Sequence, residues 1–480
     1  MPDVTKRICT ESTTLGADTT FVGPRKRVLQ NLDEFGLVAR VLRDYGDCIK
    51  FQTDSGRLVT WNGQRFGDFP HIAGQLVKDV IAKIVAEFHD GDLHVDEHGE
   101  VVEREDLLQF QKRSSSYGVV QKILKALQLA PRAHVKSADF DADNYLINLE
   151  NGVLDLRSGV LITHIPTQLH MKLAPVKWVA EAKCPAWEEF VQEITCGDRE
   201  LAAYLQRLVG YCLSGSTQEE VLPILHGSGA NGKSVFLSRV RKLLGSGEYA
   251  ITLGTGSILS SSFHGIRCDL RQLEGARVAL AIEANKGSRL DEAVLKALTG
   301  GDEISARAMR ENPVQFTPHA KILMAVNHLP GFEGNDRGIR RRLQVVPFKH
   351  EFDGRVRKEE VDRKLDAEAE GILAWAVVGF QEWRKQGLNP PEAVVQATLA
   401  YFEASDNIGE FLRERTSRGA GYKTPLRSLY GDYADWTKDA CVDCVGPHRF
   451  TELLLERGHT QGRDRNCRFW QDLAIRLLND

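Results

Sequence analysis

Gly227-Ser-Gly-Ala-Asn-Gly-Lys-Ser234 has the spacing of a phosphate-binding loop, with two fixed glycines followed by a lysine and a hydroxyl residue. The five residues before it, 221–225, are apolar and rich in branched side chains, and residues 235–244 have helical apolar spacing. A strand, a glycine loop and a helix form the context in which this pattern binds phosphate. The sequence therefore predicts a nucleoside triphosphate site, and the flanking residues disfavour a chance glycine-rich turn.

Each part of this loop has a physical role in the prediction. Backbone N–H groups can curl around phosphate oxygens, and the N-terminus of the following helix adds partial positive charge. Lys233 can reach the outer phosphates, and the Ser234 hydroxyl can hold a magnesium ion. The predicted nucleotide contacts are Gly227, Gly229, Ala230, Asn231, Gly232, Lys233, Ser234 and Val235.

The composition limits the kinds of protein this chain can be. Its 480 residues are enough for about three domains, and fractions of 42% apolar and 27% charged residues are typical of a globular protein. A net charge of −4 disfavours a protein that coats nucleic acid over its whole surface. It leaves room for a local basic channel.

Cysteine usage and the N-terminal residues predict a cytoplasmic protein. The nine cysteines show no framework spacing, which indicates a reduced compartment. The first residues contain no apolar signal region, and no run is long enough to span a membrane, so we expect no membrane association. Cys441 and Cys444 form a close pair, but without a second pair or histidines at ligand spacing they do not predict zinc.

Periodicity divides the chain into four parts of an α/β protein. Residues 1–28 are polar and aperiodic and are expected to form a flexible tail, and residues 29–214 alternate strand-like and helical runs. Residues 215–388 form the nucleotide-binding domain, and residues 389–480 form a C-terminal domain. The elements predicted in the N-terminal part are strands at 57–61, 145–148 and 152–156, helices at 72–88 and within 184–213, and turns at Asn62-Gly63 and Ser158-Gly159.

Three apolar runs, 277–282, 320–326 and 343–348, predict the sheet of the nucleotide-binding domain. Runs this continuous are typical of strands buried on both faces, as in a parallel sheet. Residues 361–383 form one amphipathic helical stretch, which we expect to pack as a lid beside the nucleotide.

Two polar residues follow buried strands and are candidates for catalysis. Glu283 comes about fifty residues after Lys233, where a carboxylate can polarise water and help to hold Mg²⁺. The alternative is an acid that only marks the exit of the strand into solvent. Asn327 ends the next strand, where a neutral amide can orient the attacking water, or it is an ordinary turn residue.

The segment Asp336-Arg-Gly-Ile-Arg-Arg-Arg-Leu343 supplies candidate arginine fingers. An arginine here can reach a phosphate held by a neighbouring subunit and stabilise the charge of the transition state. Arg341 and Arg342 are the candidates, of which one suffices as the finger while the other makes a structural ion pair. A solvated basic turn is the alternative.

Residues 304–316 read as two short strands around Arg310-Glu-Asn-Pro313, a hairpin. In a ring such a hairpin would project Arg307 or Arg310 into the pore, where they would grip backbone phosphates without reading sequence. Surface charge is the alternative for either arginine. Lys296, in the block 295–302, is a further candidate DNA contact.

The C-terminal part predicts a DNA-contacting module. Phe450, Leu453 and Leu454 share a helix that begins near Gly446-Pro447. The chain then runs through the basic residues Arg463, Arg465 and Arg468. A helix followed by a basic hairpin is typical of a winged helix that contacts the DNA backbone. Subunit docking or a purely structural role is the alternative.

In order and spacing these motifs resemble superfamily III helicases, and more narrowly the phage and plasmid replication proteins related to the poxvirus helicase–primase. The matching motifs are the loop at 230–234, the block 296–302, Val326-Asn-His-Leu-Pro330, Arg341-Arg342, an upstream helicase-associated region from Asn151 to Tyr211, and downstream residues from Ile372 to Tyr401. The resemblance implies an AAA+-type core in a homo-hexameric ring with ATP and Mg²⁺ between subunits. It further implies 3′-to-5′ movement on single-stranded DNA and at forked duplexes, as in a replicative DNA helicase.

The chain departs from that pattern at two positions. Relatives often carry a second acid after the equivalent of Glu283, where this chain has Ala284, and a tryptophan where it has Arg340. No acid cluster for a primase is found between residues 30 and 180, and Asp139-Phe-Asp-Ala-Asp143 is expected to be a structural turn. A separate primase or polymerase would then supply primers. An origin-binding initiator or regulatory ATPase, or an AAA+ protein remodeller, are the alternative functions.

Overall fold

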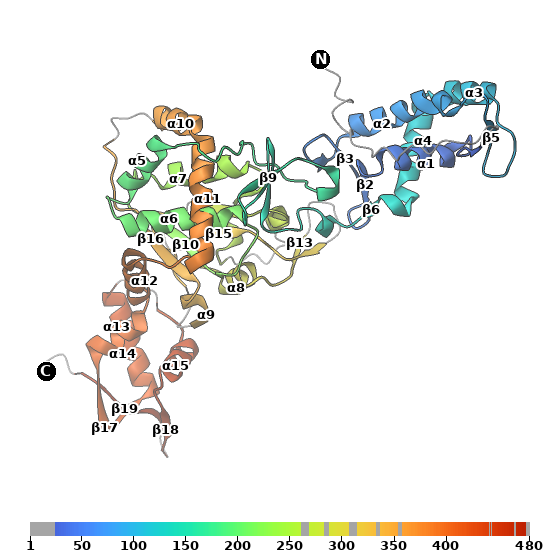
Figure 1. The fold of residues 1–480 in the computed structure, drawn as a ribbon. Coiled ribbons are helices and arrows are strands. Elements are labelled where there is room, and N and C mark those ends of the chain that lie inside the picture. Colours follow the sequence, from blue (N-terminus) through green and yellow to red (C-terminus); the bar gives the residue numbers. More distant parts are fainter. Residues whose placement is uncertain are drawn as a thin grey trace. The chain divides into compact units, whose positions relative to one another are not determined.

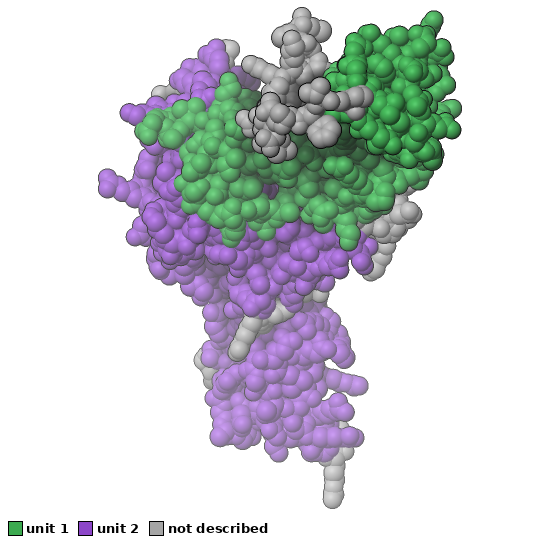
Figure 2. All heavy atoms as spheres, turned by 45° about the vertical axis from the view of Figure 1, so that its right-hand side comes forward, with its two compact units in different colours: residues 1–182, 243–249 green, residues 183–242, 250–480 purple. Residues whose placement is uncertain are grey.

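The computed structural model describes residues 25–260, 268–282, 288–306, 314–332, 337–353, 358–440, 442, 444–464 and 467–476. The chain divides into two compact units, coloured in Figure 2. Residues 1–182 and 243–249 form the first, and residues 183–242 and 250–480 form the second. Residues 183–214, which the sequence analysis groups with the N-terminal domain, thus lie in the second unit.

The first unit begins with a mixed α/β layer whose four-stranded sheet has the order β4-β3-β2-β6. β3 occupies residues 57–61, as predicted, and the helix predicted at 72–88 ends as α2 at Lys83, with a 3₁₀ turn after it. Trp61 and Val77 lie in the shared core. The elements are β1 (Lys26–Val28), α1 (Glu34–Tyr45), β2 (Ile49–Gln52), β3 (Arg57–Trp61), β4 (Phe66–Gly67), α2 (Pro70–Lys83), β5 (Leu93–Val95), α3 (Arg104–Ser114), α4 (Tyr117–Ala126) and β6 (His134–Val135).

A second, antiparallel sheet in this unit contains β7 (Leu146–Leu149), β8 (Gly152–Asp155) and β9 (Val160–Ile162). The predicted hairpin turn at Ser158-Gly159 joins β8 to β9, with Gly159 at a φ of 73°. Asp141, from the acidic set, accepts hydrogen bonds from the backbone N–H groups of Met171 and Lys172. The prediction of a structural turn at this set is therefore confirmed.

The second unit is built on a five-stranded sheet with the order β11-β12-β15-β10-β16, in which all neighbouring strands are parallel. The three apolar runs form three of its strands, and β15 is buried along its whole length, as expected of a sheet covered on both faces. The strands are β10 (Leu222–His226), β11 (Ala250–Leu253), β12 (Val278–Ile282), β15 (Lys321–Val326) and β16 (Leu343–Pro347).

Two helices of this unit cross at a pair of glycines, α6 (Arg199–Leu213) and α11 (Ala369–Gln386) (Figure 1). A Cβ atom on Gly210 would lie 2.1 Å from the backbone nitrogen of Phe380, and one on Gly379 would lie 2.1 Å from the carbonyl oxygen of Gln206. Only glycine allows this approach. The contact explains why residues 183–214 join the second unit.

Residues 361–383 are helical, as predicted, except at Glu368, where α10 (Lys358–Ala367) ends and α11 begins. The Glu368 carboxylate accepts hydrogen bonds from the backbone nitrogens of Ala186 and Trp187, at 3.1 and 3.0 Å. These belong to the first turn of α5 (Pro185–Ile194), whose N–H groups have no partner within the helix. The break thus places a carboxylate on a helix N-terminus.

The remaining elements complete the predicted hairpin and the C-terminal region. β13 (Ile304–Ala306) pairs antiparallel with β14 (Val314–Phe316), which confirms the hairpin. At the C-terminus an antiparallel sheet of order β17-β19-β18 packs with three helices around a core that includes Trp470 and Phe450. The other elements are α7 (Lys233–Leu244), α8 (Glu292–Gly300), α9 (Arg337–Arg340), α12 (Glu392–Ala404), α13 (Asn407–Arg415), β17 (Thr416–Pro425), α14 (Leu426–Asp439), α15 (Pro447–Glu456), β18 (Gln461–Arg463) and β19 (Arg468–Ile475).

Candidate functional site

The glycine loop lies between β10 and α7, as predicted, and its backbone turns sharply. Gly229, Ala230 and Gly232 have positive φ values of 127°, 50° and 80°. A Cβ atom on Gly227 would lie 2.4 Å from the backbone carbonyl oxygen of Phe348, so this position accepts only glycine. Because α7 begins at Lys233, the free N–H groups of its first turn belong to the loop.

Lys233 is buried and held inside the loop. Its Nζ donates hydrogen bonds to the Gly227 carbonyl oxygen at 2.9 Å and to Asn231 Oδ1 at 2.6 Å. Burial lowers the pKa of its ammonium group. A phosphate bound in the loop would offer the Lys233 ammonium a charged acceptor in place of the neutral Gly227 and Asn231 oxygens. Ser234, next in sequence, is exposed, and Val235 is half-buried.

Residues 348–352, which follow β16, lie along the glycine loop. No feature of the sequence indicates this contact. The Asn231 amide donates to the Phe348 carbonyl oxygen at 3.3 Å, and the Phe352 N–H donates to the Ala230 carbonyl oxygen at 2.9 Å. Ser228 Oγ donates to the Glu351 carboxylate at 2.9 Å. Three loop residues are therefore fixed by this one segment, and no short motif signals it in the sequence.

Asn327 lies at the same edge of the sheet as the glycine loop. It follows β15, which pairs in parallel with β10 so that Val326 lies opposite His226. The Gly227 N–H donates to the Val326 carbonyl oxygen at 3.4 Å. The pKa of the His226 side chain is lowered, mainly by burial and secondly by the nearby Lys233 ammonium. No motif in the sequence points to this histidine.

Glu283 lies outside the described residues, but the strand before it is described. β12 ends at Ile282, which lies opposite Ala325 of β15. The carboxyl ends of β12, β15 and β10 therefore meet at one edge of the sheet. The part of the chain that the structure describes contains no cluster of three or more acidic, histidine or cysteine side chains suited to a metal.

Arg341 and Arg342 come just before β16 and have different surroundings. The Arg342 side chain is 9% exposed and donates hydrogen bonds to Thr299 Oγ1, the Gly338 carbonyl oxygen and the Glu220 carboxylate, at 3.0, 2.9 and 3.1 Å. The Arg341 side chain is 65% exposed and contacts the Glu220 carboxylate at 3.0 Å. Arg342 is thus built into the fold, and Arg341 faces solvent.

These arginines lie at the edge of the sheet opposite the glycine loop. Leu343 pairs with Leu222 at the start of β10, whereas the loop follows His226 at its end. Five residues of parallel strand span roughly 16 Å at about 3.3 Å each. The structure therefore separates Arg341 from the loop of its own chain by the length of the sheet.

The candidate DNA contacts are described only in part. Lys296 lies half-buried on α8. Arg307 and Arg310 lie outside the described residues, between β13 and β14 in the sequence. Within the described ranges, no helix combines the length and apolar character needed to cross a membrane.

The helix after the glycine loop is tied to α10 by charge. Arg239 of α7 is buried, and it donates hydrogen bonds to the Asp366 carboxylate and, at 2.8 Å, to the Asp362 carboxylate. Lys242 also contacts Asp366, at 2.8 Å. The predicted lid stretch therefore contacts the helix that carries Lys233.

Comparison with known proteins gives two family matches. Residues 39–196 match a family described as D5 N terminal like, and residues 225–342 match a family of unknown function. The second match covers the glycine loop, Asn327, Arg341 and Arg342. Each match spans less than half of the chain.

Three curated proteins similar to this chain come from viruses, and each is named "Putative helicase". They are L207/L206 of Acanthamoeba polyphaga mimivirus (28% identity over 62% of this chain), 022R of Frog virus 3 (26% over 46%) and 121R of Invertebrate iridescent virus 3 (23% over 68%). The matched regions cover 34%, 25% and 39% of those proteins, so this chain corresponds to a part of each. Two apo structures of the NrS-1 C-terminal region align over 88% of this chain, at 11% and 12% identity and TM-scores of 0.46 and 0.47, covering 94% and 95% of those chains.

Proposed function

We propose that this chain is an ATP-dependent replicative DNA helicase with a superfamily III, AAA+-type core. One observation carries the proposal: a single edge of a parallel sheet brings together the glycine loop, Asn327 and the strand that leads into Glu283. A triphosphate on the loop would present its outer phosphate to that edge, where water, metal and polar side chains are needed. The viral relatives named as helicases support the same function.

The proposed roles follow from the chemistry of each residue and from its place in the sequence relative to this edge of the sheet. The loop N–H groups and Lys233 would hold the phosphates, and the Ser234 hydroxyl and Glu283 would hold Mg²⁺. Glu283 also accepts the proton of the attacking water, and Asn327 orients that water. Mg²⁺ would supply charge neutralisation at the phosphates when bound.

Arg341 is the proposed finger, and it would act on a neighbouring subunit. We propose a structural role for Arg342, because it is buried and has three protein partners. Arg341 is exposed and lies at the edge of the sheet away from its own loop. An exposed guanidinium so placed can complete a site only on another copy of the chain, which supports a ring, proposed to be a homo-hexamer.

The proposed DNA contacts are Lys296 and the hairpin arginines Arg307 and Arg310, lining the centre of the ring. The C-terminal region has the element order α13, β17, α14, α15, β18, β19. We propose that it is a winged-helix-like domain, since three helices pack there with a three-stranded antiparallel sheet. Movement 3′-to-5′ and a separate primase belong to the same proposal.

Lys233→Ala is expected to abolish ATP hydrolysis and the unwinding of forked duplexes, because it removes the ammonium group that the loop holds where the phosphates would bind. Hydrolysis and strand separation are measured on substrates with a 3′ or a 5′ tail, with Lys242→Ala on the same helix as the matched control. Retained hydrolysis in Lys233→Ala would refute the site. Specific binding to duplex DNA and ATP-dependent switching without strand separation would instead favour an initiator.

A further inference from the structure

The glycine loop has a neighbouring segment on each side at the carboxyl edge of the parallel sheet. β10 lies between β15 and β16, and both pairings are parallel. Asn327 follows β15, the loop follows β10, and residues 348–352 follow β16. In the proposed function the outer phosphate faces the side of Asn327. The nucleoside end of the nucleotide is then directed to the other side of the loop, beside residues 348–352.

Two hydrogen bonds hold this segment against the loop. The Phe352 N–H donates to the Ala230 carbonyl oxygen, and Ser228 Oγ donates to the Glu351 carboxylate, each at 2.9 Å. Both of these loop residues are exposed, so the contacts lie at the surface of the protein. Phe352 is thus fixed to the loop through its backbone rather than through its ring.

The Phe352 ring belongs to an aromatic group that packs on the loop. It lies within 13° of parallel to the Phe190 ring, with centres 6.2 Å apart, and meets the His350 ring edge to face at 4.4 Å. Phe190 is 5% exposed, and a Cβ atom on Gly232 of the loop would lie 3.2 Å from its ring. Phe352 and His350 are only half-buried. The group therefore presents two partly exposed rings next to the loop.

The exposed Glu351 carboxylate lies between these two rings in the sequence and contacts the loop through Ser228. A carboxylate repels a phosphate, since their charges have the same sign. Its oxygens act only as acceptors and can take several hydrogen bonds, of which Ser228 supplies one. Ribose hydroxyls are donors that suit such a group, and an acidic residue binds a ribose hydroxyl in dinucleotide-binding folds. The chemistry of this position therefore favours the sugar over the phosphates.

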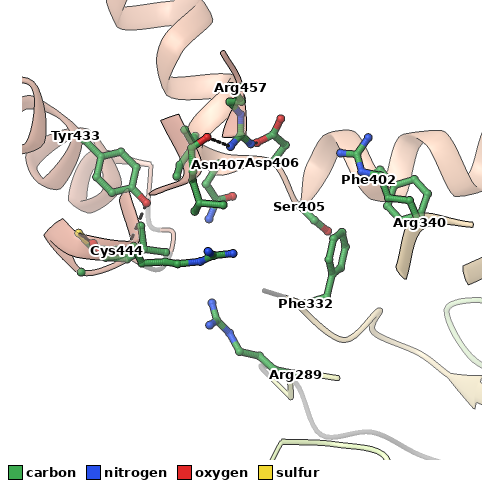
Figure 3. Close-up of a pocket in the computed structure, with 15 residues that line it drawn as sticks. Arg289, Phe332, Arg340, Phe402, Ser405, Asp406, Asn407, Tyr433, Cys444 and Arg457 are labelled. Atoms are coloured by element: carbon green, nitrogen blue, oxygen red, sulfur yellow. Dashed lines mark hydrogen bonds and ion pairs between the residues drawn. The ribbon is translucent and has the colours of Figure 1, made fainter. Parts of the chain in front are cut away.

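We propose that residues 350–352 form the nucleoside part of the nucleotide site, with the base against the Phe352 and His350 rings and the ribose hydroxyls on Glu351. This assignment rests on the proposed function, because the phosphates of the same nucleotide occupy the glycine loop. Aromatic rings stack with bases of any kind, so the rings contribute affinity without selecting one base. The pocket in Figure 3 is a different place in the second unit, since it is lined by neither the glycine loop nor residues 348–352.

The test compares three ligands that the protein does not need to hydrolyse: ADP, 2′,3′-dideoxyADP and pyrophosphate. Equilibrium binding of each to the full chain is measured with Mg²⁺ present. Phe352→Ala is expected to weaken ADP by about tenfold, as for a lost stacking contact, and to leave pyrophosphate unchanged. Phe352→Tyr keeps the ring and is expected to restore ADP binding.

Glu351→Ala changes an exposed side chain, so it keeps the test valid if Phe352→Ala does not fold, which chemical unfolding reports. It is expected to weaken ADP by about tenfold, as for a lost hydrogen bond to a charged group, and to leave 2′,3′-dideoxyADP unchanged. Glu189→Ala, an exposed acid on α5, is the matched control and is expected to bind all three ligands as the parent does.

A loss of pyrophosphate equal to the loss of ADP would show that Phe352 only supports the shape of the loop, and it would overturn the proposal. Unchanged ADP binding in Phe352→Ala and Glu351→Ala would overturn it as well. Lys233→Ala separates this result from a failure of the proposed function. If that variant binds ADP and pyrophosphate as the parent does, the glycine loop is not the phosphate site and both proposals fall.

Discussion

At the scale of single residues, the adjacent arginines before β16 have different surroundings, and we propose different roles for them. Arg342→Ala leaves Thr299, the Gly338 carbonyl oxygen and Glu220 without a buried partner. We expect it to lower the free energy of unfolding by about 2 kcal/mol, the range for lost buried hydrogen bonds to a charged group. Arg341→Ala removes an exposed ion pair and is expected to change stability by less than about 0.5 kcal/mol.

Chemical unfolding of the two variants, run beside ATP hydrolysis of the assembled protein, separates these proposed roles. We expect Arg341→Ala to be as stable as the parent and inactive. The reverse pattern, with Arg342→Ala stable and Arg341→Ala active, would exchange the roles of the two residues.

The sequence could predict the glycine loop at residue level, because its spacing is local and each position has one physical role. The sequence could not predict which of Arg341 and Arg342 is buried and which is exposed. That difference arises because α8 places Thr299 beside Arg342 alone, whereas Glu220, just before β10, contacts both arginines. Asn327 and the strand before Glu283 were predicted from strand ends alone, whereas Glu351 and Phe352 reach the loop through tertiary structure.

The buried Lys321 ammonium group is expected to make the free energy of unfolding depend on pH. Its Nζ is buried at the start of β15, donates to the carbonyl oxygens of Ser214 and His319, and lies near Tyr211, Cys212 and Arg277. Burial lowers the pKa of Lys321 to about 7, against 10.5 in the unfolded chain. Above pH 7 the unfolded chain therefore binds more protons, and the folded state gains stability as pH rises.

Lys321→Met is expected to remove this gain, which is up to about 1.4 kcal/mol per pH unit. The free energy of unfolding is measured from pH 7 to pH 9 in both proteins. Above pH 9 the Cys212 thiol would act in the opposite direction. Its pKa is about 9 in the unfolded chain, and burial raises it to about 12 in the folded protein, so ionisation of this thiol would lower stability as pH rises. Equal slopes in the two proteins would mean that the buried lysine stays charged.

At the scale of elements, Glu368 lies between α10 and α11 and connects them to the first turn of α5. Glu368→Ala leaves the N–H groups of Ala186 and Trp187 without their acceptor. We expect a loss of about 1 kcal/mol in the free energy of unfolding, as for removal of a helix N-cap. Glu370→Ala, an exposed acid in the first turn of α11, is the matched control and is expected to cost less.

Periodicity alone predicted a helical stretch without this break, because the apolar stripe continues from Leu365 to Ala369 and Ile372. The break depends on a carboxylate that meets a helix end from far along the chain, which no local pattern contains. If Glu368→Ala and Glu370→Ala unfold alike, the carboxylate does not hold the two segments together.

At the scale of the whole molecule, the parallel sheet was predictable and the grouping of segments around it was not. Apolar runs indicate strands buried on both faces, and β12, β15 and β16 form at those runs. The assignment of residues 183–214 to the second unit depends on the glycine contact between α6 and α11. That contact pairs positions almost 170 residues apart, which a single sequence does not reveal.

The separation of Arg341 from its own loop leads to a prediction about mixed assemblies. Arg341→Ala subunits keep an intact loop, and Lys233→Ala subunits keep an intact finger, so each pure protein is expected to be inactive. In an equal mixture, one head-to-tail interface in four pairs an intact loop with an intact finger, so about a quarter of the parent hydrolysis rate should return. The double variant Lys233→Ala/Arg341→Ala in place of Lys233→Ala offers no finger and should restore nothing. A mixture that assembles yet shows no recovery, or a single chain that hydrolyses ATP at the full rate, would place the catalytic arginine elsewhere.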